Sequence, residues 1–354
     1  GVVYSITATN SNPRLSGTGV TNVAGTAATG VFTVSATGLT AGTAYSYAAY
    51  ATTSAGTTYS STGTFATLPL PPAITNGALT ASGTYGSAIT TYTITGSNTP
   101  TSYSATGLPA GLSLDPATGA ITGTPTTTVG SPFSVTIGAT NAGGSGTATL
   151  AFTVGKASQT ITFGTLANKT YGAASFSVAA TASSSLTPSY SIVSGPATLS
   201  GSTVTLTGAG TVVVRTSQAG DGNFTAATPV DQSFTVAKAT LTVTADAKSR
   251  VYGAANPTLT ATITGYVNNE TSTVISGAAA VTTATTTTSN VGGYTITAAV
   301  GTLSATNYDF SFTAGTLTVS KAALTVTAEA KSRTYGAANP ALTATLTGFL
   351  NGEA

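Results

Sequence analysis

Apolar and polar residues alternate along many short segments of this chain. In ATLTVTA (239–245), Leu241 and Val243 face one side of an extended segment, and the intervening threonines face the other. The segments YTITAAV, TVTLTG, YTITG and LTVSKA follow the same pattern, and Gly, Pro, Asn or Ser interrupts it about every ten residues. This pattern predicts short strands packed in β-sandwiches. No stretch combines a helical period with capping residues.

The alternating segments belong to a longer internal repeat. The sequence FTVAKATLTVTADAKSRVYGAANP, which ends at Pro257, returns as LTVSKAALTVTAEAKSRTYGAANP, which ends at Pro340. A Tyr-Gly pair begins at four positions, at intervals of 86, 81 and 83 residues: Tyr85, Tyr171, Tyr252 and Tyr335. These matches predict tandem units of 80 to 86 residues.

The repeat predicts five segments and very short joins between them. The segments are 1–68, 72–155, 156–238, 239–320 and 321–354. FTVGKA, FTVAKA and LTVSKA connect strand to strand without a flexible spacer, and only ATLPLPPAI (66–74) reads as an extended, semi-rigid link. Short joins restrict bending, so we expect independently folded sandwiches in an elongated rod, in which four units measure about 150 Å.

The composition supports a folded all-β protein of unusually low charge. Charged residues make up 5% of the 354 residues, against about a quarter in an average protein. Low charge accompanies disorder only where hydrophobicity is also low, and here 41% of the residues are apolar. Thr, Val, Ile, Tyr and Phe favour strands.

The distribution of charge excludes two classes of partner. Ten basic and eight acidic residues are scattered along the chain and give a net charge of +2. No basic cluster marks a nucleic-acid or anionic-membrane surface. The apolar runs are far shorter than the roughly 20 residues that cross a bilayer. We therefore expect no nucleic-acid partner and no membrane span in this segment.

The residue types also argue against catalysis. The chain has no His and no Cys, and its eight acids are mostly far apart in sequence. A calcium site gathers several carboxylates, whereas Asp221 in AGDGNF and Asp309 in TNYDF stand alone in corresponding loops, where we expect Asx-type turns. The sequence predicts a protein that is not an enzyme, with no catalytic, cofactor-binding or metal residues and no cofactor.

A charged stripe occurs in the last two segments. If the chain is extended, three charged residues share one face in each segment: Asp246, Lys248 and Arg250, then Glu329, Lys331 and Arg333. We interpret the stripe as a solvated strand whose charges discourage edge-to-edge pairing. The alternative is a docking face, with Glu270 or Glu353 as a partner.

Aromatic residues gather in the first segment, at Tyr45, Tyr47, Tyr50 and Tyr59. Exposed aromatic rings are a common platform for sugars. Tyr45 and Tyr47 lie at the spacing of a core-facing strand, however, and the chain has no Trp. We therefore interpret the cluster as core packing.

Two segments resemble known extracellular folds. From Leu39, LTAGTAYSYAAYATTSAG resembles the late strands of fibronectin type III domains, and Leu39, Gly42, Thr43 and Tyr45 match their tyrosine corner. Earlier strands have no counterpart, so we expect Gly1 not to be a natural start. GLPAGLSLDPATGAITGTPT (107–126) resembles the putative-Ig, cadherin-like domains of bacterial surface proteins. Cadherin calcium sites do not carry over, because Asp115 is the only acid in 1–220.

The remaining segments resemble other bacterial repeats. SGPATLSGSTVTLTGAGTVVVRTSQAGDGNF is similar to bacterial Ig-like repeats, and both 239–320 and 321–354 resemble the MBG domain of very large adhesins. The last segment stops after two or three predicted strands. We expect the sequence to be a piece of a longer protein, or to borrow strands from a neighbour.

Together these resemblances imply a non-catalytic stalk of a bacterial extracellular or cell-surface protein, such as an adhesin involved in biofilms. The implied partners are neighbouring copies of the chain or other surface and matrix proteins, with glycans left open. A self-assembling subunit of an extracellular filament or sheath, completed by strand addition between molecules, is the alternative. A carbohydrate-binding array of a secreted enzyme is a weaker one.

Overall fold

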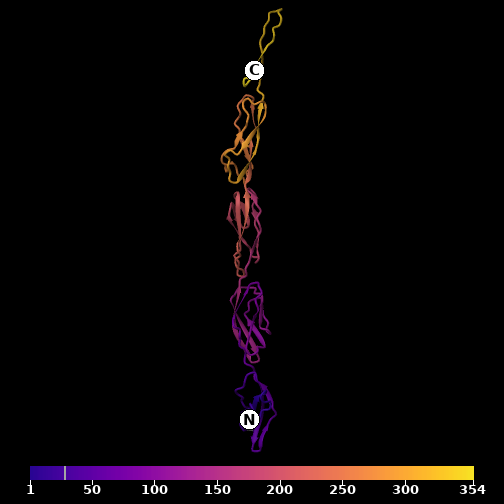
Figure 1. Cartoon of the computed structure of the whole chain (residues 1–354), viewed down its shortest axis with the longest axis vertical. Helices are drawn as coiled ribbons and strands as arrows, with labels where there is room; N and C mark the ends of the chain where they lie inside the picture. Colours follow the sequence, from indigo (N-terminus) through magenta and orange to yellow (C-terminus); the bar gives the residue numbers. More distant parts are fainter. Residues whose placement is uncertain (28) are drawn as a thin grey trace. The chain divides into compact units, whose positions relative to one another are not determined.

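The computed structural model describes residues 1–27 and 29–354. Within this part of the chain the regular structure is β-strand, apart from one turn of 3-10 helix, η1 (Ser272–Val274). Figure 1 shows strands and connecting loops along the coloured sequence. The all-β prediction is confirmed. The chain forms two compact units, 1–159 with 219–226, and 160–218 with 227–354.

The first predicted segment forms one five-stranded sheet. Its order is β2-β1-β3-β4, and β5 also pairs with β3. The strands are β1 (Val2–Ile6), β2 (Thr21–Val23), β3 (Ala44–Thr53), β4 (Gly56–Tyr59) and β5 (Gly63–Ala66). The Tyr45 hydroxyl accepts the Thr40 N–H at 2.9 Å, which is the tyrosine corner that the sequence predicts. Tyr45 is buried, but Tyr47 is 39% exposed, so core packing is wrong for Tyr47.

The second segment has two sheets around one core. They have the orders β7-β10-β9 and β6-β12-β11-β8. The strands are β6 (Thr80–Thr84), β7 (Tyr92–Thr93), β8 (Ser102–Thr106), β9 (Leu112–Leu114), β10 (Ala120–Gly123), β11 (Phe133–Asn141) and β12 (Gly144–Gly155). Ile94, Ile121 and Phe152 are fully buried in this core, as the period-two pattern requires.

The third segment lies in three small sheets. Their orders are β13-β16, β15-β19-β18 and β14-β21-β20-β17. The strands are β13 (Ile161–Phe163), β14 (Lys169–Thr170), β15 (Phe176–Ser177), β16 (Ala180–Ala182), β17 (Ser189–Ser194), β18 (Ala197–Ser200), β19 (Thr203–Leu206), β20 (Gly210–Ser217) and β21 (Val230–Ala237). Arg215 and Asp231 form a bidentate ion pair across β20 and β21.

The fourth segment is a two-sheet sandwich, and the fifth contributes one hairpin. The sheets have the orders β24-β22-β27 and β23-β28-β26-β25, and the hairpin pairs β29 with β30. The strands are β22 (Ala239–Ala245), β23 (Lys248–Val251), β24 (Ala261–Thr264), β25 (Ala280–Thr282), β26 (Gly292–Ala299), β27 (Tyr308–Thr313), β28 (Gly315–Ser320), β29 (Thr325–Ala328) and β30 (Ala344–Thr347).

The third and fourth segments share a hydrophobic core. One buried cluster combines Val212 and Phe234 of the third segment with Leu241 and Tyr308 of the fourth. A second cluster, around Leu317, lies within the fourth segment alone. The sequence suggested separate interiors, because strand periodicity indicates that a side is buried but not what covers it.

The charged stripe does not form one solvated face. The chain leaves one sheet after Ala245 and enters the other at Lys248, so the period-two argument breaks between the two strands. Arg250 is only 6% exposed. Its Nε donates to Asn256 Oδ1 at 2.8 Å, and its Nη2 donates to the Thr286 carbonyl. For Arg250 the solvated interpretation is therefore wrong.

Candidate functional site at the Tyr-Gly turns

In segments two to four, the Tyr-Gly pair lies at the end of a parallel pair of strands. In segments two to four, a strand near the start of the segment pairs in parallel with the last strand: β6 with β12, β14 with β21, and β23 with β28. The tyrosine N–H then donates to the final residue of that last strand. The pairs are Tyr85 with Gly155 O (2.9 Å), Tyr171 with Ala237 O (2.8 Å) and Tyr252 with Ser320 O (2.8 Å). The Tyr-Gly turn is thereby held at the point where the next segment begins.

In the second unit, a β-turn of the fourth segment covers the turn at Tyr171. The turn runs from Val267 to Glu270, and the Glu270 N–H donates to the Val267 carbonyl at 3.0 Å. Its two central residues, Asn268 and Asn269, have φ of 53° and 58°. Positive φ at both positions is the type I′ geometry, which asparagine tolerates.

Glu270 is the polar centre of this contact. Its Oε1 accepts the Tyr171 hydroxyl at 2.7 Å, and its Oε2 accepts the Tyr308 hydroxyl. The two tyrosine rings meet edge to face at 5.7 Å and are nearly fully buried. Hydrogen bonds to a carboxylate are stronger than those between neutral groups. We call this contact between a Tyr-Gly turn and a turn of the next segment the joint; its hydrogen bonds fix the two segments in position.

Gly172 makes the close approach possible. Its φ is +89°, and a Cβ built there would lie 2.5 Å from the Cβ of Val267. A side chain at this position would therefore push the turn of the fourth segment away.

A simpler and more exposed tyrosine–glutamate contact recurs between the fourth and fifth segments. The Tyr252 hydroxyl donates to Glu353 Oε1 at 2.6 Å, and a Cβ on Gly253 would lie 2.6 Å from Leu350 Cδ1. Asn351 and Gly352 have φ of 54° and 78°, so the turn geometry is also repeated. Glu270 and Glu353 are thus partners of tyrosines and not of the charged stripe, which corrects the docking-face alternative.

The first unit contains a related contact without a glutamate. The rings of Tyr85 and Phe224 meet edge to face at 5.3 Å. In the first unit, Asn223 Oδ1 accepts a hydrogen bond from the Thr128 N–H at 3.2 Å. In the second unit, Asn307 stands in the corresponding loop, and its Oδ1 accepts a hydrogen bond from the Ala209 N–H at 3.0 Å. Asp221 Oδ1 accepts the N–H groups of Asn223 and Phe224, which is an Asx-type turn.

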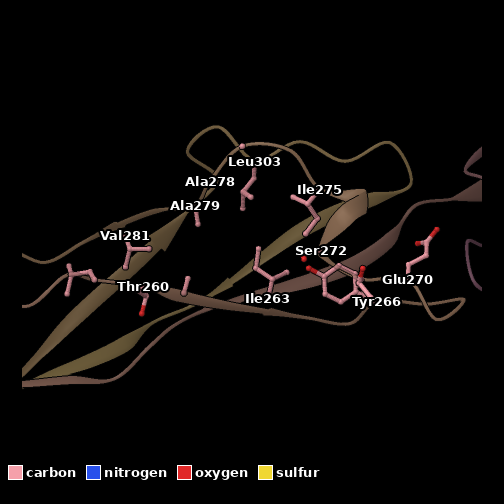
Figure 2. Close-up of a pocket in the computed structure, with 14 residues that line it drawn as sticks. Thr260, Ile263, Tyr266, Glu270, Ser272, Ile275, Ala278, Ala279, Val281 and Leu303 are labelled. Carbon is pink, nitrogen blue, oxygen red and sulfur yellow. The ribbon is translucent and has the colours of Figure 1, made fainter.

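The fourth segment also contains an open cleft of about 780 Å³. Figure 2 shows Ile263, Val281 and Leu303 along it, with Tyr266 and Glu270 near one end. Its lining is mainly aliphatic, and Glu270 is its one acid, already bonded to two tyrosines. In residues 1–27 and 29–354 no group of three His, Cys, Asp or Glu side chains could hold a metal ion.

Alkaline pH should weaken the joint at Tyr308. Burial, and then the hydrogen bond to Glu270, raise the pKa of Tyr308 above its usual value. The unfolded chain therefore loses this proton first. The free energy of unfolding that this shift contributes is complete below about pH 10 and falls as the pH rises further.

Urea unfolding at pH 8, 10 and 11 should show this loss of stability, and the loss should be smaller in Tyr308→Phe. Tyr335→Phe, at a fully exposed site, is the control and should behave as wild type. Equal slopes in all three proteins would contradict the expectation.

The fold and the repeated joints define a class, a tandem array of Ig-like β-sandwiches. Residues 66–155 match the Putative Ig domain family, and residues 241–318 and 324–354 match the MBG domain (YGX type). The resemblances inferred from GLPAGLSLDPATGAITGTPT and from the 83-residue repeat are thereby confirmed. No curated protein matches the chain.

Matches among solved structures come from several kinds of protein. A structure described as an α-galactosidase from Bacteroides fragilis is 31% identical over 24% of this chain and 18% of its own, with a TM-score of 0.22. A second such structure from the same organism is matched over 22% of its length, so the chain spans about a fifth of each. Human protocadherin-24 EC1-2 is 18% identical over 48% of this chain and all of its own, with a TM-score of 0.27. An I-band fragment of titin is 12% identical over 73% and 100%, with a TM-score of 0.28.

These families are those of repeat-based extracellular proteins with structural or adhesive roles, and they are generally non-catalytic. Within the part of the chain that the structure describes, no helix is long and apolar enough to cross a membrane.

Proposed function

We propose that this chain is a spacer in the stalk of a bacterial cell-surface or secreted adhesive protein. The observation that carries the proposal is the repeated joint, in which the Tyr-Gly turn of one segment is covered by a turn of the next. The joint between the third and fourth segments has a buried ring pair and a carboxylate between two hydroxyls, and these contacts resist bending. Neighbouring surface or matrix proteins are its proposed partners.

The spacer function predicts a large radius of gyration in solution. A compact globule of 354 residues has a radius of gyration of about 20 Å. A thin rod with a length of about 150 Å has a radius of gyration of about 43 Å. We expect small-angle X-ray scattering of the full chain to give the larger value, with a rod-like cross-section. A value near that of the globule would refute the proposal.

Assembly by strand addition is a second candidate. The hairpin β29–β30 exposes Leu324, Val326 and Leu342, whose counterparts 83 residues earlier include the fully buried Leu241 and Val243. A sheet face of this kind needs covering strands, and in this candidate function a neighbouring molecule supplies them. Scattering at several concentrations separates the two functions, because a spacer keeps its mass and an assembling subunit grows.

A further inference from the structure

A third Tyr-Gly turn of the same type is open. Tyr335 and Gly336 lie in the letters Tyr-Gly-Ala-Ala-Asn-Pro, which are identical to those that begin at Tyr252. The φ of Gly336, +86°, matches the +82° of Gly253. In contrast to Gly253, nothing lies within 4 Å of a Cβ built on Gly336, and the Tyr335 side chain is fully exposed.

We propose that Tyr335 and Gly336 form a docking surface for one specific partner, the apolar-Asn-(Asn or Gly)-Glu turn of a further repeat of this type. The glutamate accepts the Tyr335 hydroxyl, and the apolar residue covers Gly336. This inference rests on the proposed spacer function and deepens it, because it names the two matching halves by which one repeat recognises the next.

The occupant is defined by the two joints that are already filled. Val267–Glu270 and Leu350–Glu353 have the same order of residue types, the same backbone geometry and the same two contacts. Each half needs the other: the glycine admits the apolar side chain, and the tyrosine hydroxyl supplies the donor for the carboxylate. The surface at Tyr335 offers both features, and it is uncovered. Among the described residues it also has no parallel last strand, which holds the turns at Tyr171 and Tyr252.

The turn that contacts Tyr85 in the first unit does not meet these requirements. The first unit pairs Tyr85 with Phe224 through their rings, and nothing lies within 4 Å of a Cβ built on Gly86. A turn without the apolar residue and the glutamate would therefore leave Gly336 open, even if it approached Tyr335. The docking surface thus discriminates between repeats by their turn sequence.

An extended chain tests the proposal. A second copy of residues 272–354 is placed after Ala354, which supplies the strands that follow Thr271 in the fourth segment and a second Leu-Asn-Gly-Glu turn. Hydrogen exchange read by mass spectrometry follows the amides of residues 331–337. The reference is a chain extended by residues 272–320 alone, which supplies the last strand of the fifth segment but not the added turn. We expect protection at least tenfold greater with residues 272–354 than with this reference, and equal exchange in the two extended chains overturns the proposal.

A double-mutant cycle identifies the contact. In the extended chain, Tyr335→Phe is combined with Glu353→Gln in the added copy only, and we expect the unfolding equilibrium to show coupling of about tenfold. The matched control is Tyr252→Phe with the original Glu353→Gln, which should couple similarly. Additive effects at Tyr335 with coupling at Tyr252 overturn the proposal. Failure of the spacer function would instead appear as compact scattering of the unextended chain.

Discussion

Leu317→Asp is expected to abolish cooperative unfolding of residues 239–320. Leu317 is fully buried in the cluster that belongs to the fourth segment alone. An unpaired charge in an apolar core costs several kcal/mol or more, which is comparable to the whole stability of a small domain. Hydrogen exchange should show loss of protection throughout β26 and β28. Val300→Asp, at a site that is 48% exposed, is the matched control and should change little.

The same variant also shows how far the repeats depend on each other. Strict locality of repeat stability predicts that residues 160–238 keep their protection. The shared core predicts partial loss, because Leu241 and Tyr308 of the fourth segment pack with Phe234 of the third. We expect an intermediate result, with residues 160–238 folded but less protected. Wild-type exchange in 160–238 would show that the shared cluster contributes no stability to the third segment.

Gly111→Ala is expected to destabilise the second segment by about 3 kcal/mol. Gly111 has φ of +89°, and a Cβ there would collide with the carbonyl oxygen of Thr124. The hairpin β9–β10 must therefore shift as well as accept a strained backbone.

Gly86→Ala is the matched control for this prediction. Gly86 has φ of +70°, but nothing lies within 4 Å of a Cβ built there, so only the left-handed conformation is penalised, by about 1–2 kcal/mol. Urea denaturation of both variants compares the two costs. Equal losses would show that the close approach to Thr124 is relieved without cost.

The sequence predicts the strands well, because burial on one face of a strand leaves a period of two. Leu241 and Val243 are fully buried, as the alternation in ATLTVTA indicates. The prediction from alternation fails where the chain crosses from one sheet to the other. The alternation from Asp246 to Arg250 suggested one face, yet the crossing after Ala245 turns Arg250 inward.

The sequence shows the residues of the joint but does not show that they pair. The recurring Tyr-Gly pair and the equivalent positions of Glu270 and Glu353 are both evident from the 83-residue repeat. Their pairing is not, because Tyr171 and Glu270 are 99 residues apart and belong to different segments. The two-residue pattern Asn-Asn or Asn-Gly before each glutamate was the available signal for a type I′ turn.

The parallel ladders have a mechanical consequence. In the fourth segment, β22 and β23 at its start run parallel to β27 and β28 at its end. Tension applied to the two ends of such a segment slides the paired strands past each other. The ladder's hydrogen bonds then share the load and rupture together, whereas a hairpin pulled open at one end would unzip bond by bond. A segment built in this way yields abruptly, at high force, and holds its length until it does.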